Sequence, residues 1–172
     1  MESSKILAGY ATRYGSTLEV ITKIGSSLRE SGFQVDIKPL REIRDLEVYK
    51  AVVIGAPLFM FHWHRDALWF LSKHKESLKK LPVAVFALGP IHDPYDSEEW
   101  ELSNSQLNNE LAKFKWFKTV SVKIFGGKFD PDKLGFFLKL FAGKVPASNI
   151  IDWHDINTWS KSLPTMFGFA VD

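Results

Sequence analysis

The sequence predicts an α/β protein with three layers, in which helices cover both faces of a doubly wound parallel sheet. Segments typical of strands and of helices alternate along most of the 172 residues. The segments 51–55 and 83–89 are continuous apolar runs, as expected of strands that are buried on both faces. We therefore expect a sheet of five parallel strands in the order 2-1-3-4-5, within a single domain that comprises residues 1–172.

The first βαβ unit is read from the periodicity of its apolar residues. A strand at 6–11 precedes a helix whose apolar residues recur at helical spacing, namely Leu18, Ile21, Ile24 and Leu28. Ser31-Gly32 ends this helix, and residues 33–38 alternate as a second strand. The third strand follows at 51–55.

The second half continues the alternation. A helix is expected from about 65 to 80, and the fourth strand lies at 83–89. Asp96 and Glu99 form a capping pattern before a polar helix, and residues 120–125 form the fifth strand. A last helix follows Asp152.

Composition excludes several classes of function. The chain is 45% hydrophobic and 24% charged, an ordinary balance for a folded domain. Its net charge of +2 is too small to indicate a nucleic-acid partner. The absence of cysteine excludes disulfides and thiol catalysis and fits a cytoplasmic protein, and no apolar run reaches the length of a membrane span.

The first strand runs into a turn that is typical of a phosphate site, made of Thr12, Arg13, Tyr14, Gly15, Ser16 and Thr17. Backbone amides at the start of a helix are unpaired and carry partial positive charge, so they bind anions. Two better-known phosphate motifs do not fit, because five residues separate Gly9 from Gly15 and Ser16 stands where lysine is required. The alternative is a hydroxyl-rich turn that caps an ordinary helix.

In a doubly wound sheet the loops after the first, third and fourth strands meet beyond the carboxyl ends of the strands. Here these loops are 12–17, 56–64 and 89–95. The second offers an apolar and aromatic surface, with Ala56, Pro57, Leu58, Phe59, Met60, Phe61 and His62. The third contributes Leu88, Gly89, Pro90, His92 and Tyr95. A phosphate loop beside two such loops suits FMN, although Trp63 is equally well interpreted as a core residue.

The residues of the first loop, Thr-Arg-x-Gly-x-Thr, match the T-x-x-G-x-T phosphate loop of flavodoxin-like proteins. The segment 52–56, the His62-Trp63-His64 step and Asp152-Trp153 extend the match over nearly the whole chain. The sequence thus resembles long-chain flavodoxin-like proteins of the menaquinone-dependent protoporphyrinogen IX dehydrogenase type. Phe61 departs from the pattern because that family usually has a glycine there. A bulky residue at this point would narrow access to the flavin or reshape the backbone near it.

The resemblance implies FMN as the cofactor. It also implies an FMN-dependent oxidoreductase that passes electrons from a reduced organic substrate, plausibly protoporphyrinogen IX, to a quinone or another acceptor. Two alternatives stay open. One is a flavodoxin-type electron carrier between protein partners, and the other is a flavodoxin-like module that no longer binds flavin.

Two residues have candidate roles in such a site. His62 is the candidate catalytic residue, because it could donate a hydrogen bond to the flavin or shuttle a proton as the ring is reduced; the alternative is a packed histidine. Arg13 would neutralise the phosphate or attract a substrate carboxylate, or simply lie exposed. His62 and His64 have the spacing of a metal pair, but no third ligand follows, so we expect no metal.

Two further segments suggest contacts with partners. Residues 93–112 carry six acidic residues and no lysine or arginine, which favours a solvated helix face over a dock for a redox protein. Residues 134–141 are rich in large apolar side chains. We expect them to pack against the sheet edge or against a second copy in a homodimer, the alternative being peripheral contact at the inner face of the membrane.

Overall fold

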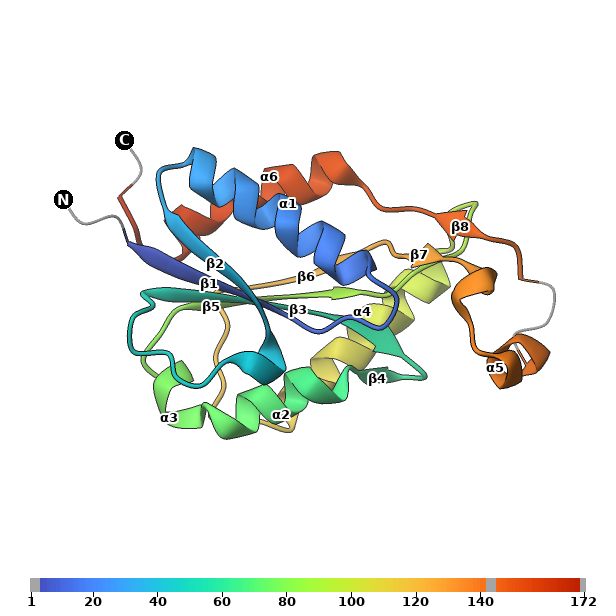
Figure 1. Ribbon diagram of the computed structural model, residues 1–172, viewed down its shortest axis with the longest axis horizontal. Helices are drawn as coiled ribbons and strands as arrows, with labels where there is room; N and C mark the ends of the chain where they lie inside the picture. The colour runs from blue at the N-terminus through green and yellow to red at the C-terminus, as the bar shows by residue number, and fades with distance from the viewer. Residues whose placement is uncertain (1–3, 142–144, 171–172) are drawn as a thin grey trace.

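The computed structural model describes residues 4–141 and 145–170, and within them all side chains except those of residues 137, 138 and 141. Its centre is a twisted sheet whose parallel strands follow the order β2-β1-β3-β5-β6 (Figure 1). These strands are β1 (Lys5–Tyr10), β2 (Gln34–Pro39), β3 (Ala51–Phe59), β5 (Val83–Leu88) and β6 (Ser121–Phe125). Counted along the chain, the order is 2-1-3-4-5, so the predicted fold is confirmed.

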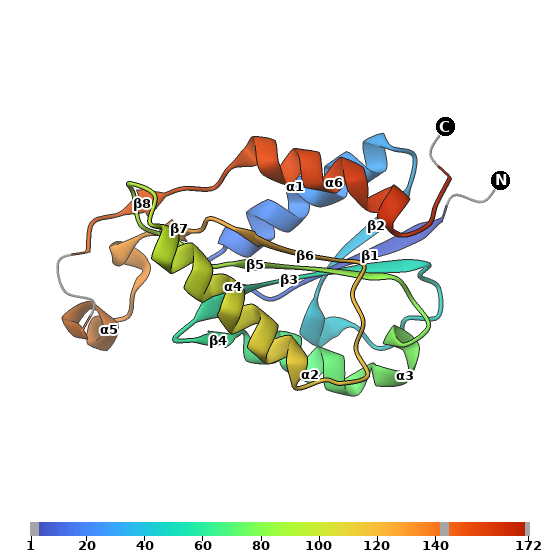
Figure 2. The same ribbon diagram turned by 180° about the vertical axis from the view of Figure 1, so that it is seen from behind.

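Helices cover both faces of the sheet, as the two opposite views show (Figures 1 and 2). One face carries α1 (Ser16–Glu30) and α6 (Trp153–Met166), and the other carries α2 (Arg65–Lys73), α3 (Lys75–Leu78) and α4 (Ser97–Ala112). A short 3-10 turn, η1 (Leu40–Glu42), follows β2. Each face has its own apolar core, and the side chains of β3 and β5 alternate between the two. This explains why both strands are continuous apolar runs.

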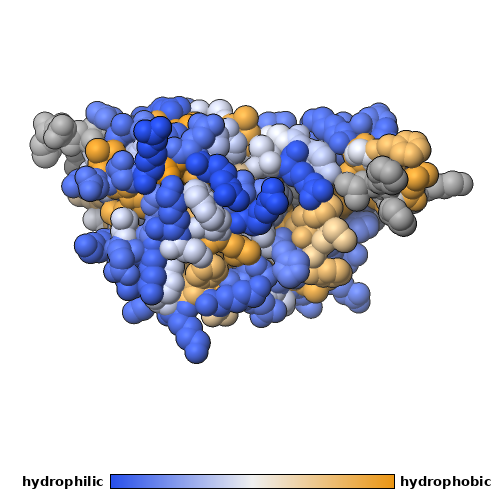
Figure 3. All heavy atoms as spheres, turned by 60° about the horizontal axis from the view of Figure 1, so that its bottom comes forward, coloured by the Kyte–Doolittle hydropathy of each residue, from blue (hydrophilic) through white to orange (hydrophobic). Residues whose placement is uncertain are grey.

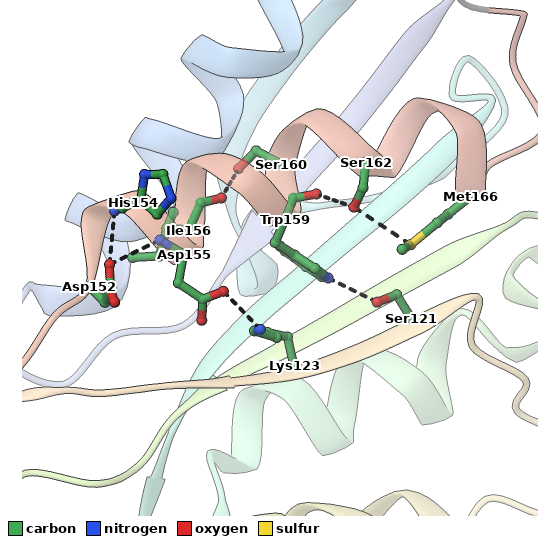
Figure 4. Close-up of polar contacts among 10 residues, drawn as sticks. All are labelled: Ser121, Lys123, Asp152, His154, Asp155, Ile156, Trp159, Ser160, Ser162 and Met166. Atoms are coloured by element: carbon green, nitrogen blue, oxygen red, sulfur yellow. Dashed lines mark hydrogen bonds and ion pairs between the residues drawn. The ribbon is translucent and has the colours of Figure 1, made fainter. Parts of the chain in front are cut away.

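Helix α6 is fixed to the edge strand β6 by polar contacts (Figure 4). The Asp152 carboxylate caps the helix by accepting hydrogen bonds from the amides of His154 and Asp155, both at 3.0 Å. The indole of Trp159 donates to the Ser121 hydroxyl at 2.9 Å. The Asp152-Trp153 signal in the sequence thus marks the start of a helix that packs on one face of the sheet and is tied to β6.

The predicted helix at 65–80 is wrong as a single helix. The chain breaks at His74, whose backbone leaves the helical region with φ −104° and ψ 22°, and α3 begins at the next residue. His74 is buried, and its ring lies 4.6 Å from that of Phe70. Burial lowers the pKa of His74, so its ring is neutral and packs as a core group.

The predicted loop at 56–64 is also corrected. Strand β3 continues to Phe59 and turns back into β4 (His62–Trp63), which pairs antiparallel with it. The segment is therefore a hairpin that projects from the carboxyl end of the sheet (Figure 1). Because a hairpin tip points away from its sheet, the tip residues Met60 and Phe61 lie farther from the sheet end than the residues of β3 and β4.

Between β6 and α6 the chain forms an extension at the same end of the molecule (Figure 1). It contains β7 (Lys128–Phe129), η2 (Pro131–Lys133), α5 (Phe136–Phe141) and β8 (Ser148–Asn149), and β7 pairs antiparallel with β8. Phe136 and Leu140 are exposed, and the side chains of residues 137, 138 and 141 lie outside the described part, so packing of this segment against the sheet edge stays a prediction. A role in a dimer stays a prediction.

Figure 3 shows a largely hydrophilic surface with hydrophobic atoms gathered toward the end that carries the β3–β4 hairpin and α5. Met60, Phe61, Phe136 and Leu140 are among the exposed large apolar residues of this end. Within the described ranges, no helix is both long enough and apolar enough to cross a membrane.

Candidate flavin site

A cleft of about 190 Å³ lies at the carboxyl ends of the central strands β1, β3 and β5. This is where a doubly wound sheet places its ligand. We call it the flavin cleft. Its walls come from the three predicted loops and from the extension: Thr12, Arg13, Tyr14, Ser16, Thr17, Pro57, Leu58, Phe59, Leu88, Gly89, Ile91, Gly127, Lys128, Phe129 and Leu134.

The start of α1 forms one end of the flavin cleft. Gly15 adopts a left-handed conformation with φ 96°, and its amide donates to the Thr12 hydroxyl at 2.8 Å. No side chain caps α1, whereas side chains cap α2, α4 and α6. The backbone N–H groups of the first turn of α1 are therefore available to bind a ligand, together with the hydroxyls of Ser16 and Thr17. These groups fit a phosphate.

The other walls of the flavin cleft are mainly apolar. Pro57, Leu58 and Phe59 come from the end of β3, and Leu88 and Gly89 come from the end of β5. A Cβ added to Gly89 would lie 2.8 Å from a side-chain oxygen of α4, so glycine lets the turn approach that helix. A flat ring can lie between these walls with little water around it, which fits the isoalloxazine of FMN.

Arg13 lies at the boundary of the flavin cleft. Its guanidinium carbon is 3.9 Å from the centre of the Phe59 ring, and its Nε donates to the Tyr14 hydroxyl at 3.1 Å. Such stacking holds a planar cation in place without neutralising it. Arg13 also lines a second, larger cleft on the other side of Phe59. It can therefore reach an anion in either cleft.

The second cleft has a volume of about 730 Å³ and opens beside the flavin cleft. Thr12, Arg13 and Phe59 belong to both clefts. The remaining walls of the second cleft come from β4 and from the start of α2: His62, Trp63, His64, Arg65 and Leu68. A small molecule bound there would lie next to the ring site, separated from it by the Arg13–Phe59 pair.

His62 faces α4. Its Nδ1 lies 3.0 Å from Oε1 of Glu110, which also accepts from Lys113 at 2.7 Å. Burial by itself raises the pKa of Glu110, but the hydrogen bonds from Lys113 and His62 outweigh burial and lower it below the ordinary value. The carboxylate is thus ionised at neutral pH and accepts from Nδ1–H of His62, so any further hydrogen bond of this ring is made through Nε2.

His64 has a structural task at the start of α2. Its Nδ1 accepts a hydrogen bond from the Asp66 amide at 3.1 Å, which caps the helix. Burial is the main cause that lowers the pKa of His64. Within the described ranges, no three His, Asp or Glu side chains lie close enough together to hold a metal ion.

Met60 and Phe61 form the tip of the hairpin and line neither cleft. Both have positive φ, 47° and 70°, as a two-residue turn of this type requires. Their side chains are 69% and 68% exposed. The Phe61 ring therefore does not narrow the flavin cleft. The positive φ at this position explains why the resembled family usually has glycine there.

The third loop is held by α4. The amides of Ile91 and His92 donate to the two oxygens of Glu99 at 3.0 and 3.1 Å, and the His92 ring also contacts Glu99. The Tyr95 ring stacks on Trp100 and is 71% exposed. Of the loop residues proposed for the cofactor, His92 and Tyr95 thus face α4, whereas Leu88 and Gly89 line the flavin cleft. Ile91, which was not among the proposed residues, lines it as well.

Ala56 and Pro90 lie behind the site. Ala56 is fully buried, and its carbonyl accepts from the indole of Trp63 at 3.1 Å. Trp63 is 1% exposed, so its interpretation as a core residue is confirmed. The carbonyl of Pro90 accepts from the Gly127 amide at 2.7 Å, which ties the third loop to the extension.

The extension supplies the residues that sequence reasoning missed. Gly127, Lys128, Phe129 and Leu134 line the flavin cleft, and Lys133 donates from Nζ to the Tyr14 carbonyl at 3.4 Å. One signal was present, because Gly127 follows the fifth strand and so lies at the carboxyl edge of the sheet. Lys128 and Leu134 are positioned by the pairing of β7 with β8, which no local pattern indicates.

The fold and the position of the cleft define a protein of the flavodoxin type. A family model described as a flavodoxin domain matches residues 7–147, and the chain belongs to the flavodoxin family. It is 30% identical over 175 residues to a protein named protoporphyrinogen IX dehydrogenase [quinone] from Escherichia coli (strain K12). The alignment covers 92% of this chain and 94% of that protein. A flavodoxin domain implies a flavin cofactor, typically FMN.

Solved structures agree on the fold. Flavodoxin 1 from Bacillus cereus superposes with a TM-score of 0.57 at 16% identity, over 96% of this chain and 97% of that one. A flavodoxin from the domain Archaea gives a TM-score of 0.58 at 12% identity, over 95% and 99% of the two chains. At these identities the likeness concerns the architecture alone.

Proposed function

We propose that this protein is an FMN-dependent oxidoreductase that takes electrons from a reduced organic molecule of the porphyrinogen class and passes them to a quinone. The support from the sequence is the 30% identity to the Escherichia coli dehydrogenase, which extends over 92% of this chain. The support from the structure is a second cleft that opens directly beside the flavin cleft.

The residues present fit FMN, which supplies a redox-active ring when bound. The amides at the start of α1, with Ser16 and Thr17, hold the phosphate, and Thr12 fixes the turn by accepting from the Gly15 amide. Phe59, together with Leu58 and Leu88, excludes water from the ring site. His62 holds or accepts a proton at Nε2, because Glu110 engages Nδ1.

The single observation that favours an enzyme over an electron carrier is the second cleft. A carrier exchanges electrons with proteins through an exposed ring edge and needs no space for a small molecule. Here a cleft of about 730 Å³ shares Thr12, Arg13 and Phe59 with the flavin cleft. A donor bound there would lie within reach of the ring.

The acidic segment 93–112 gives little support to the carrier. Three of its six acids have internal tasks, because Asp96 caps α4, Glu99 holds the third loop and Glu110 binds His62. Only Asp93, Glu98 and Glu101 remain, and these exposed acids suit solvation of a helix face.

Anaerobic turnover tests the proposal. The purified protein is loaded with FMN, mixed with protoporphyrinogen IX without oxygen, and then mixed with a series of quinones, while flavin absorbance is recorded. We expect bleaching by the porphyrinogen, appearance of protoporphyrin, and recovery of the flavin absorbance with at least one quinone. Flavin that protein reductants reduce but porphyrinogen does not would identify a carrier. A protein that stays colourless after FMN titration would identify a module without flavin.

A further inference from the structure

We propose that the second cleft binds the carboxylate side chains of an apolar, ring-shaped organic acid and so positions the electron donor beside the flavin. The inference rests on the proposed function in one respect, namely that a donor is bound next to the ring. What it adds is an assigned site, at Arg13, His64 and Arg65, and the chemistry that this site recognises.

The titratable side chains that line the second cleft are all basic. Its titratable lining residues are Arg13, His62, His64 and Arg65, and no carboxylate belongs to the lining. Within the described part of the chain, Arg13 has no acidic partner within 4.0 Å. Arg65 lies 3.9 Å from Asp66, and that carboxylate binds Arg41 more closely, at 2.8 Å. Two guanidinium groups thus face the cleft without a close counter-charge.

His64 gives this cleft a hydrogen-bond donor, and His62, whose Nδ1 binds Glu110, gives it an acceptor at Nε2. The pKa of His64 is lowered, mainly by burial; Asp66 opposes this, and the positive charges of Arg65, Arg13 and Arg41 lower the pKa further. Neutral His64 accepts at Nδ1 from the Asp66 amide, so its proton lies on Nε2. An Nε2–H group next to two guanidinium groups is suited to a carboxylate oxygen.

The apolar part of the second cleft faces the ring site. Phe59 stands between the two clefts, and the buried Trp63 and the half-buried Leu68 form the remaining apolar wall. A ligand with an apolar ring and carboxylate arms matches both parts at once. A free phosphate or a sugar would use the cationic side only and leave the apolar wall in water.

Binding of two porphyrins to the FMN-loaded protein provides the test. Protoporphyrin IX carries two carboxylates, and its dimethyl ester has the same ring without charge, so their dissociation constants separate charge recognition from ring recognition. Arg65→Gln is the test variant, because the Arg65 side chain is 89% exposed and its loss leaves the fold intact. Arg44→Gln is the matched control, an exposed arginine outside both clefts.

We expect the diacid to bind the unchanged protein about tenfold more tightly than the ester, and Arg65→Gln to abolish most of this preference. Arg44→Gln should keep it, and the affinity for FMN should be the same in all three proteins. Equal binding of diacid and ester, or an equal loss in both variants, would overturn the inference.

Turnover separates this inference from the proposed function. If protoporphyrinogen and its ester are oxidised with equal KM, the oxidoreductase stands and the carboxylate site is refuted. If neither is oxidised but the diacid still binds in a manner that depends on Arg65, the carboxylate site stands and the proposed reaction is refuted.

Discussion

Gly15 is the residue whose backbone conformation matters most to the flavin cleft. Its φ of 96° is strained for any residue with a Cβ, yet nothing lies within 4 Å of the position that a Cβ would take. Gly15→Ala should therefore act through backbone strain alone and lower the free energy of unfolding by roughly 1–2 kcal/mol. Because the Gly15 amide belongs to the turn that presents the α1 amides, we also expect FMN affinity to fall about tenfold.

Gly32→Ala is the matched control for this prediction. Gly32 has a similar φ of 91°, equal space for a Cβ, and a position at the other end of α1. It should lose comparable stability in chemical denaturation while keeping its FMN affinity in a calorimetric titration. If both variants bound FMN equally well, the turn at Gly15 would have no part in the site.

Glu110 provides a prediction about pH. Its pKa is lower in the folded protein than the ordinary value of 4.5, so its ionised form stabilises the fold above that pH, and this contribution is lost as the pH falls through the folded pKa. Glu110→Gln removes the contribution and should cost roughly 1–3 kcal/mol at pH 7. The difference in unfolding free energy between the two proteins should shrink steadily below about pH 4.5. A difference that is constant from pH 7 to pH 3 would contradict this account.

The sequence indicated His62 and Arg13 as candidates but could not place their partners. Glu110 lies 48 positions after His62, and nothing in the local pattern shows that a hydrogen bond joins them. Likewise the stacking of Arg13 on Phe59 depends on where the hairpin leaves the sheet. Residue types revealed the chemistry available, whereas tertiary packing determined which way each group faces.

At the scale of elements, the hairpin of β3 and β4 was missed because Met60-Phe61 lacks the glycine or asparagine that marks such turns. The break between α2 and α3 was missed for a similar reason, since residues 73–76 contain neither glycine nor proline. The strands and the capped starts of α4 and α6 were predictable, because apolar runs and Asp caps are local signals.

The hairpin carries its own prediction. Phe61→Gly should relieve the strain of a phenylalanine at φ 70° and raise the free energy of unfolding by about 1 kcal/mol, since the exposed ring contributes few contacts. Met60→Ala is the control, because it shortens an equally exposed side chain and leaves the positive φ strained. Thermal unfolding of the two variants measures the contrast. A loss of stability in Phe61→Gly would show that the ring packs against something in the folded state.

At the scale of the whole molecule, the flavin cleft is assembled from segments that are distant in sequence. The turn before α1, the ends of β3 and β5, and the extension around β7 all contribute to its lining. Because these four segments meet only in the folded protein, a ligand that contacts all of them stabilises the folded state and not the unfolded state. FMN at 100 times its dissociation constant should add about 2.7 kcal/mol and raise the melting temperature by roughly 5–10 °C, as scanning calorimetry with and without FMN would show. An unchanged melting temperature would mean that FMN does not bind the folded chain.

The most direct measurement of the central claim compares FMN with riboflavin in calorimetric titrations of the flavin-free protein. The two ligands share the ring and differ in the phosphate, so their difference reports on the uncapped amides of α1. We expect FMN to bind at least about 100-fold more tightly than riboflavin, with the difference reduced in Gly15→Ala. Equal affinities, or no binding of either ligand, would contradict the account that the first turn of α1 anchors the cofactor.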